Sequence, residues 1–276
     1  MQIKYFPVNS KNSYVVFENN DKIEELEPFM KENKLSRVIF SGFLGYSKSV
    51  LPFNEDIDVI EEISIQCSNI TDLTPLYHLS NIKKISIEEN AALAHPFDIR
   101  KIAKLTDFFT DDTLKIDGFF DHPTLKQLHI EPKKTKKLDI HNENNILESL
   151  SIANSHILDL SNCKKLTQLK GLYIAYLPKI EDINFILDMP TLTDIEICSC
   201  KKINNLIATL AQKNNLEKLT LWNQGNLDSI IPLSKLEHLT TLNIWEQTKI
   251  IDGKISFLEE MPNLKKIDIR KYTHYH

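Results

Sequence analysis

The sequence is poor in the residues that several functional classes require. Its 276 residues include only six glycines, scattered along the chain, so no glycine-rich loop is present to cradle a phosphate. The 38 acidic residues outnumber the 33 basic ones, and a net charge of −5 gives no basic footprint for nucleic acid. We therefore expect neither a phosphate-binding loop nor a nucleic-acid partner.

Long apolar runs are also missing. No window approaches 18 uninterrupted apolar residues, and the first 20 residues have no long apolar core behind a basic start. The sequence therefore predicts neither a membrane span nor a secretory signal. We expect a cytoplasmic location, with secretion through an apparatus that needs no such signal left open.

Cysteines number only four, and none lies near a chain end, where the caps of secreted repeat proteins are cross-linked. We therefore expect free thiols at Cys67, Cys163, Cys198 and Cys200. The Cys198-Ser-Cys200 pair lacks the second ligand pair that a zinc site needs. Motifs for a catalytic nucleophile are missing too, so we expect no metal, no cofactor and no catalytic residues.

The chain does contain a repeat. Residues 216–222, Leu-Glu-Lys-Leu-Thr-Leu-Trp, show its core: an apolar residue, two variable ones, an apolar residue, a variable one and an apolar residue. Among the apolar positions of all copies, only Thr110 is polar. The alternation predicts a strand with one buried face, and steps of 20 to 25 residues between copies predict a solenoid. The middle residues of the copies are Val38, Ile63, Ile85, Phe108, Leu128, Leu150, Leu172, Ile195, Leu219, Leu242 and Ile267.

These repeats resemble the leucine-rich-repeat family, in particular the bacterial internalin-like subtype. The apolar return path after the strand in residues 63–82 carries the resemblance, and it is repeated in residues 23–35 and 227–239. The resemblance implies an α/β solenoid with a parallel concave sheet of about 11–12 strands and short helices or turns on the convex side. We expect a single solenoid over residues 1–276: a cap with a first irregular repeat (1–34), the repeats (35–269) and a frayed tail (270–276).

Local patterns add three expectations. Pro28 aligns with Pro75 and Pro232, which predicts that each begins a short helix after a turn. Helical spacing of apolar residues appears in residues 204–213 and 255–261. Leucine-rich repeats usually place Asn or Cys three residues past the strand, and Asn90 and Cys200 match that pattern.

The candidate binding residues are those that point away from the apolar face of the strands. Both tryptophans of the protein, Trp222 and Trp245, occupy the same register on consecutive repeats, so we expect neighbouring indoles. Aromatic residues dominate the binding energy of many interfaces, although these indoles would alternatively shield a flank of the sheet. Small outward residues beside them (Ser149, Ser151, Ala153, Gly171 and Ala175) predict a shallow recess. The predicted partner-binding residues are Tyr173, Asp194, Glu196, Trp222, Trp245 and Phe109.

The hypothesis that follows is a non-enzymatic scaffold that binds a protein partner on its concave face. A stand-alone bacterial repeat protein of this kind would serve as an immunity protein against a toxin or as an effector. The alternatives are a carbohydrate or small-ligand module that uses the concave aromatics, and an enzyme in a non-repeat domain, for which the caps leave too few residues. The two strand faces also predict that Leu219→Ala is destabilising and Thr220→Ala almost silent.

Overall fold

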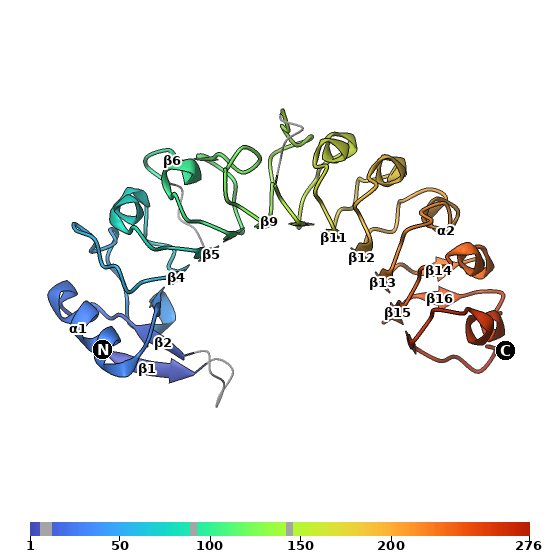
Figure 1. The fold of residues 1–276 in the computed structure, drawn as a ribbon, viewed down its shortest axis with the longest axis horizontal. Coiled ribbons are helices and arrows are strands. Elements are labelled where there is room, and N and C mark those ends of the chain that lie inside the picture. Colours follow the sequence, from blue (N-terminus) through green and yellow to red (C-terminus); the bar gives the residue numbers. More distant parts are fainter. Residues whose placement is uncertain (6–12, 89–92, 142–145) are drawn as a thin grey trace. The chain divides into compact units, whose positions relative to one another are not determined.

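The computed structural model describes residues 1–5, 13–88, 93–141 and 146–276, and its contacts divide the chain into two compact units, Met1–Ile130 and Glu131–His276. In each unit the strands lie along one side and the helical turns along the other (Figure 1). The prediction that residues 1–276 form one continuous solenoid stays a prediction, and each unit is described by itself.

The N-terminal unit carries six parallel strands in the residues that the structure describes: β2 (Ser13–Val16), β3 (Arg37–Ser41), β4 (Glu62–Gln66), β5 (Lys84–Glu88), β7 (Asp107–Thr110) and β9 (Gln127–Ile130). Strand β1 (Gln2–Tyr5) pairs antiparallel with β2. A short second ladder joins β6 (Phe97–Asp98) to β8 (Ile116–Asp117). The return segments include α1 (Ile23–Asn33), η1 (Gly42–Leu44), η2 (Thr74–His78) and η3 (Ile99–Lys101).

The C-terminal unit repeats the arrangement with strands β10 (Ser149–Ala153), β11 (Gly171–Ala175), β12 (Asp194–Cys198), β13 (Lys218–Trp222), β15 (Thr241–Trp245) and β17 (Lys266–Ile269), all parallel. Strands β14 (Asn226–Leu227) and β16 (Lys249–Ile250) form a second short ladder. The returns carry η4 (Ser161–Lys165), η5 (Asn184–Asp188), α2 (Leu206–Leu210), η6 (Ile231–Lys235) and η7 (Ser256–Glu260).

The register of the strands follows the repeat. Within each unit, the middle residue of one copy pairs with the middle residue of the next, as Leu172 does with Ile195 and Leu219 with Leu242. The apolar pairs point inward and are buried, which confirms the predicted repeat strands and their parallel pairing. Thr110, the one polar exception, is fully buried, and its Oγ1 donates to the carbonyl of Asp112 at 2.7 Å. A buried hydroxyl needs such a partner, so the exception does not break the core.

Strand β17 departs from this pattern. Ile267 occupies the middle position of its copy, yet 44% of the residue is exposed, and Ile269 is only half-buried. The described residues place no strand on the far side of β17, so neither side chain has the next repeat to cover it.

The prediction for Pro28 is wrong, although those for Pro75 and Pro232 are confirmed. Pro75 and Pro232 lie in the first turns of η2 and η6, where the missing N–H has no helical acceptor to lose. Pro28 instead lies inside the 11-residue helix α1. An interior proline removes a backbone hydrogen bond, but burial of Leu26 and Met30 on either side of it holds the helix against the unit.

The C-terminal tail is not frayed, contrary to the prediction. The Tyr275 hydroxyl accepts a hydrogen bond from the backbone N–H of Ile250, and His274 Nε2 lies 2.8 Å from the Ile250 carbonyl. The backbone carbonyl of His276 accepts from the N–H groups of Ile255 and Ser256. Aromatic and backbone contacts therefore fold the tail onto the preceding return segment.

The predicted turn role of Cys200 agrees with its contacts. Its thiol lies 3.3 Å from the Cys198 carbonyl in the turn after β12, and Gln224 Nε2 makes the equivalent bond to Trp222 one repeat later. Asn90 lies outside the described residues. All four cysteines are free, as predicted, and all four are buried.

Candidate functional site: the strand face of the C-terminal unit

The strand face is the surface formed by the outward residues of β10 to β13, β15 and β17. Because side chains alternate along a strand, the inward apolar pairs leave every second residue on this face. The register aligns these residues in rows that cross the strands. The middle row is Ser151, Tyr173, Glu196, Thr220, Asn243 and Asp268.

The two tryptophans lie side by side on this face, as the register predicts. Trp222 pairs with Trp245, and their ring centroids lie 5.8 Å apart with an interplanar angle of 86°. Aromatic rings favour such an edge-to-face contact. Trp222 remains 38% exposed, whereas Trp245 is half-buried. Trp222 is therefore the indole that faces solvent, and Trp245 packs against it.

Tyr173 on β11 and the acidic residues Asp194 and Glu196 on β12 form a second group on this face. The Tyr173 hydroxyl donates to Asp194 Oδ2 at 3.4 Å, and Lys218 Nζ lies 3.6 Å from the same oxygen. Burial, and then the charge of Asp194, raise the pKa of Tyr173 to about 12. The pKa of Glu196 is raised for the same two reasons. Within the part of the chain that the structure describes, Asp194 has a basic side chain within ion-pair distance, whereas Glu196 has none.

The predicted recess beside the aromatics is wrong at its centre, because Tyr173 covers Gly171. A Cβ atom added to Gly171 would lie 2.9 Å from the Tyr173 hydroxyl oxygen and 3.0 Å from Cε2 of the ring. The absence of a side chain at Gly171 therefore makes room for the tyrosine of the same strand rather than for a partner.

Asn243 lies in the middle row but is only 7% exposed. Its Nδ2 donates to Thr220 Oγ1 at 3.0 Å, while its Oδ1 is buried and has no hydrogen-bond partner. An unpaired buried acceptor costs about 1–3 kcal/mol. The interior of the strand face therefore contains a polar group that the described residues leave unsatisfied.

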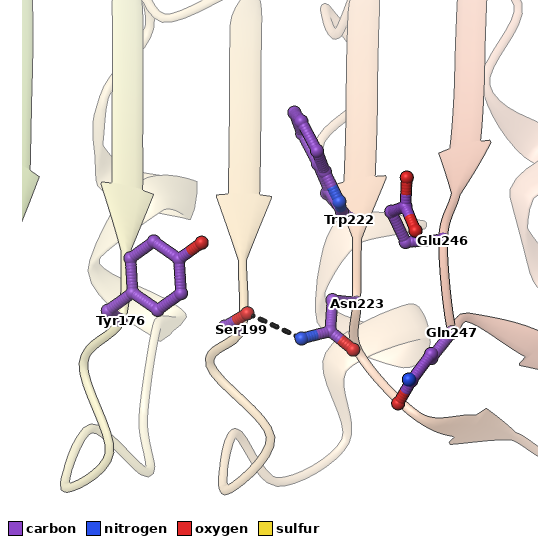
Figure 2. Close-up of a pocket in the computed structure, with 6 residues that line it drawn as sticks. All are labelled: Tyr176, Ser199, Trp222, Asn223, Glu246 and Gln247. Atoms are coloured by element: carbon purple, nitrogen blue, oxygen red, sulfur yellow. Dashed lines mark hydrogen bonds between the residues drawn. The ribbon is translucent and has the colours of Figure 1, made fainter.

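A pocket opens at the carboxyl end of these strands (Figure 2). Its volume is about 150 Å³, and Trp222 and Gln247 contribute to its lining. The other lining residues each follow a strand directly and adopt the left-handed conformation, with φ of 53° to 55°: Tyr176, Ser199, Asn223 and Glu246. We call these four residues the turn row.

The turn row follows from the turn that ends each strand. The backbone N–H of Tyr176 donates to the Cys198 carbonyl, and the N–H of Ser199 donates to the Trp222 carbonyl, both at 2.9 Å. These bonds carry the ladder one residue past the strands and leave the side chains on the open edge. Asn223 Nδ2 donates to Ser199 Oγ at 2.8 Å, as the dashed line in Figure 2 marks, and Asn223 Oδ1 is buried without a partner.

None of the four turn-row residues is among the binding residues predicted from the sequence, because those were chosen only from outward positions within the strands. The available signal was positional: Tyr176, Ser199, Asn223 and Glu246 are each the first residue after the last outward residue of a strand. The exposed aromatic Tyr176 among them, 55% exposed, was the strongest indication.

Phe109, the remaining predicted residue, belongs to the N-terminal unit. Its ring stacks on His129 with centroids 4.3 Å apart and an interplanar angle of 12°. Both side chains are half-buried and lie on neighbouring strands, β7 and β9. Phe109 is therefore described as part of that unit's own face, and its role in binding stays a prediction.

The described residues contain no group of three or more His, Cys, Asp or Glu side chains that could hold a metal ion. A search of those same residues finds no helix with the length and apolar character to cross a membrane.

Parallel strands that recur every 20 to 25 residues, with an inward apolar ladder and short helical returns, define the leucine-rich-repeat class, and the chain has this fold. No family model matches the chain, and a comparison with curated proteins finds no match.

Solved structures similar to the chain include an internalin, InlF, of Listeria monocytogenes, with 17% identity, coverage of 94% of this chain and 87% of that one, and a TM-score of 0.49. Internalin C2 of the same organism shares 18% identity over 66% of this chain and 72% of its own, with a TM-score of 0.36. A leucine-rich-repeat protein of Leptospira interrogans shares 14% identity over 93% of this chain and 59% of its own, with a TM-score of 0.49. The fold assignment rests on the strands and register of this chain.

Proposed function

We propose that the protein is a non-enzymatic scaffold that binds a protein partner on the strand face of its C-terminal unit. The observation that carries the proposal is the exposed Trp222 indole, which packs against Trp245 at the carboxyl end of the strand face and lies next to polar side chains. A rigid aromatic side chain next to hydrogen-bonding groups is typical of the residues that dominate protein interfaces.

The size of the surface indicates how the partner must lie. Six strands at about 4.8 Å spacing and five residues of about 3.3 Å each give roughly 400 Å². A standard interface buries about 800 Å² on each partner. The strand face supplies about half of that area, so a stable complex must extend past it. The adjoining turn row, with its pocket, is the surface onto which the partner would extend.

The proposal includes a bacterial setting, a cytoplasmic location and a role as an immunity protein or effector. Four free thiols support a reducing compartment. A toxin bound by an immunity protein would be the partner that co-purifies with the chain when both are produced together.

The test compares Trp222→Ala with Ile251→Ala. Ile251 is also a large exposed apolar residue, 44% exposed, but it lies outside the strand face. Partners captured from the source cells by the wild-type chain are identified by mass spectrometry, purified and titrated against each variant. Truncation of an interface anchor costs about 2 kcal/mol, so we expect Trp222→Ala to weaken binding roughly 30-fold. Ile251→Ala should bind as the wild type does.

Stability is measured in parallel. Loss of the edge-to-face contact should cost Trp222→Ala only about 1 kcal/mol of folding stability. If Trp222→Ala binds the purified partner normally but melts far below the wild type, the indole shields the sheet and the proposed surface is wrong.

A carbohydrate site is the second candidate, favoured by the amide, carboxylate and aromatic groups that line the turn-row pocket. Sugars stack on aromatic rings and bond to such groups. A panel of sugars that raises the melting temperature of the wild type but not of Trp222→Ala would favour this candidate over protein binding.

A further inference from the structure

The strand face contains hydrogen-bond acceptors that lack donors. Asn243 is nine-tenths buried, and its Oδ1 has no partner. In the same row, the Glu196 carboxylate is partly buried and has no cation among the described residues, because Lys218 lies against Asp194 instead. Both groups accept hydrogen bonds, so this part of the face lacks donors. The Glu196 carboxylate is half-open to solvent, whereas Asn243 Oδ1 has almost no exposed surface and becomes reachable only when its side chain turns.

The register places these acceptors on either side of one residue. Glu196 pairs with Thr220, and Thr220 pairs with Asn243, so the two acceptors project from strands two spacings apart. That separation is roughly 10 Å between the backbones, which a planar group with donors on both edges can bridge when the two side chains lean inward. Thr220 forms the floor between them, and its hydroxyl already accepts from Asn243 Nδ2.

An aromatic ring closes one end of this position. Trp222 follows Thr220 by two residues and therefore points to the same face. Figure 2 shows its indole extending back along β13 from the level of Asn223, toward the middle of the strand. The indole and the Glu196 carboxylate therefore border the space above Thr220, and Asn243 Oδ1 borders it once its side chain has turned outward.

These features differ in how well they suit the two common basic side chains. A guanidinium is planar, carries five N–H donors, bonds to two acceptors at once and stacks on aromatic rings. An ammonium is a compact, strongly hydrated charge that makes no such planar contact. The pairing of a carboxylate, an amide oxygen and an indole therefore favours arginine over lysine.

We propose that an arginine side chain of the partner protein occupies this position, with its guanidinium between Glu196 and Asn243 and stacked on Trp222. The inference rests on the proposed function, because it names the chemistry of the protein that the strand face binds. The arginine would neutralise a carboxylate whose pKa is raised by burial and by Asp194, and it would pair the buried Asn243 oxygen.

The chain contains only two tryptophans, so two indole N–H signals in a nitrogen–proton correlation spectrum report on this position. The probe is the blocked peptide acetyl-Gly-Arg-Gly-amide. Its neutral isostere with citrulline and its lysine counterpart are the comparison peptides. We expect the arginine peptide to shift the Trp222 signal saturably, and the citrulline and lysine peptides to bind at least tenfold more weakly.

Two isosteric variants of the full chain separate this position from general charge attraction. Glu196→Gln removes the carboxylate and should weaken the arginine peptide roughly tenfold, as the loss of one charge-assisted hydrogen bond does. Glu181→Gln removes an equal charge from an exposed residue outside the strand face and should leave binding unchanged. Both variants keep the shape of the side chain, and their melting temperatures confirm that they fold.

Equal binding of the arginine peptide to wild type and Glu196→Gln would overturn the inference, as would equal binding of arginine and citrulline peptides or no saturable shift. Equal binding of lysine and arginine would reduce the position to a general cation site and overturn the arginine assignment. None of these results decides the outcome of the capture experiment with Trp222→Ala, which tests the proposed protein scaffold. Failure there, with arginine binding intact, would instead refute the proposed protein scaffold.

Discussion

Leu219→Ala tests the inward ladder on which the fold depends. Leu219 is the middle residue of β13, is fully buried, and pairs in register with Ile195 and Leu242, which are also buried. Truncation of a buried leucine removes its apolar contacts and leaves a cavity, which costs about 2–5 kcal/mol. Neighbouring repeats cover Leu219 on both sides and allow little collapse into the cavity, so we expect the upper half of that range.

Urea unfolding followed by tryptophan fluorescence suits this variant. Both tryptophans lie on β13 and the adjacent β15, so the signal comes from the repeats that the substitution disturbs. Repeat proteins can unfold in parts, because each repeat contacts only its neighbours. Far-UV circular dichroism over the same titration would show whether the loss stays local or spreads through the C-terminal unit.

Thr220 supplies the control on the opposite face. The sequence alone predicts that Thr220→Ala is almost silent, but Thr220 Oγ1 accepts the only hydrogen bond that the structure shows for Asn243 Nδ2. Thr220→Ala should therefore cost about 1 kcal/mol, and Thr220→Ser, which keeps the hydroxyl, should be near neutral. If Thr220→Ser destabilises the chain as much as Leu219→Ala does, the inward and outward faces have been assigned wrongly.

Two further predictions concern single contacts. His122 is buried; its Nε2 lies 3.0 Å from the Ile99 carbonyl, its Nδ1 accepts from the Thr124 N–H, and burial lowers its pKa. As the pH falls, His122 of the unfolded chain is protonated before His122 of the folded chain. The contribution of His122 to stability should therefore be full above about pH 6.5 and be lost as the pH falls toward the lowered pKa of the folded state. In thermal melts, His122→Gln should reduce the dependence of the melting temperature on pH in this range. Gly171→Ala should push the Tyr173 ring from its place and cost about 1–3 kcal/mol, whereas the same change in a Tyr173→Ala background should cost much less. Additive effects in that double-mutant cycle would contradict the close contact.

The strands could be predicted because one physical requirement fixes them. Inward positions must be apolar in every copy, and that requirement leaves a period in the sequence which even Thr110 does not obscure. The outward register follows from alternation alone, so the proximity of Trp222 and Trp245 was predictable as well. The role of these two residues in binding stays a prediction.

The errors arise where a local rule competes with packing. Pro28 carries the same local signal as Pro75, yet burial of Leu26 and Met30 keeps it inside a helix. The tail was predicted to be frayed because it lies beyond the last repeat strand, but Tyr275 and His274 contact the backbone of Ile250 in the preceding return. The recess was expected from a group of small outward residues that includes Gly171, without the direction that the neighbouring Tyr173 ring takes.

No sequence pattern predicts the two acceptors without donors on the strand face, the Glu196 carboxylate and Asn243 Oδ1. They bear most directly on function. The solenoid constrains only its inward residues, so an outward position is free to hold a side chain that costs no stability. Serine or threonine at residue 243 would continue the row from Thr220 without a buried amide oxygen, and a neutral residue at 196 would avoid the repulsion from Asp194. A face that retains both costly groups next to an exposed indole is better explained by a donor that arrives with a partner than by folding.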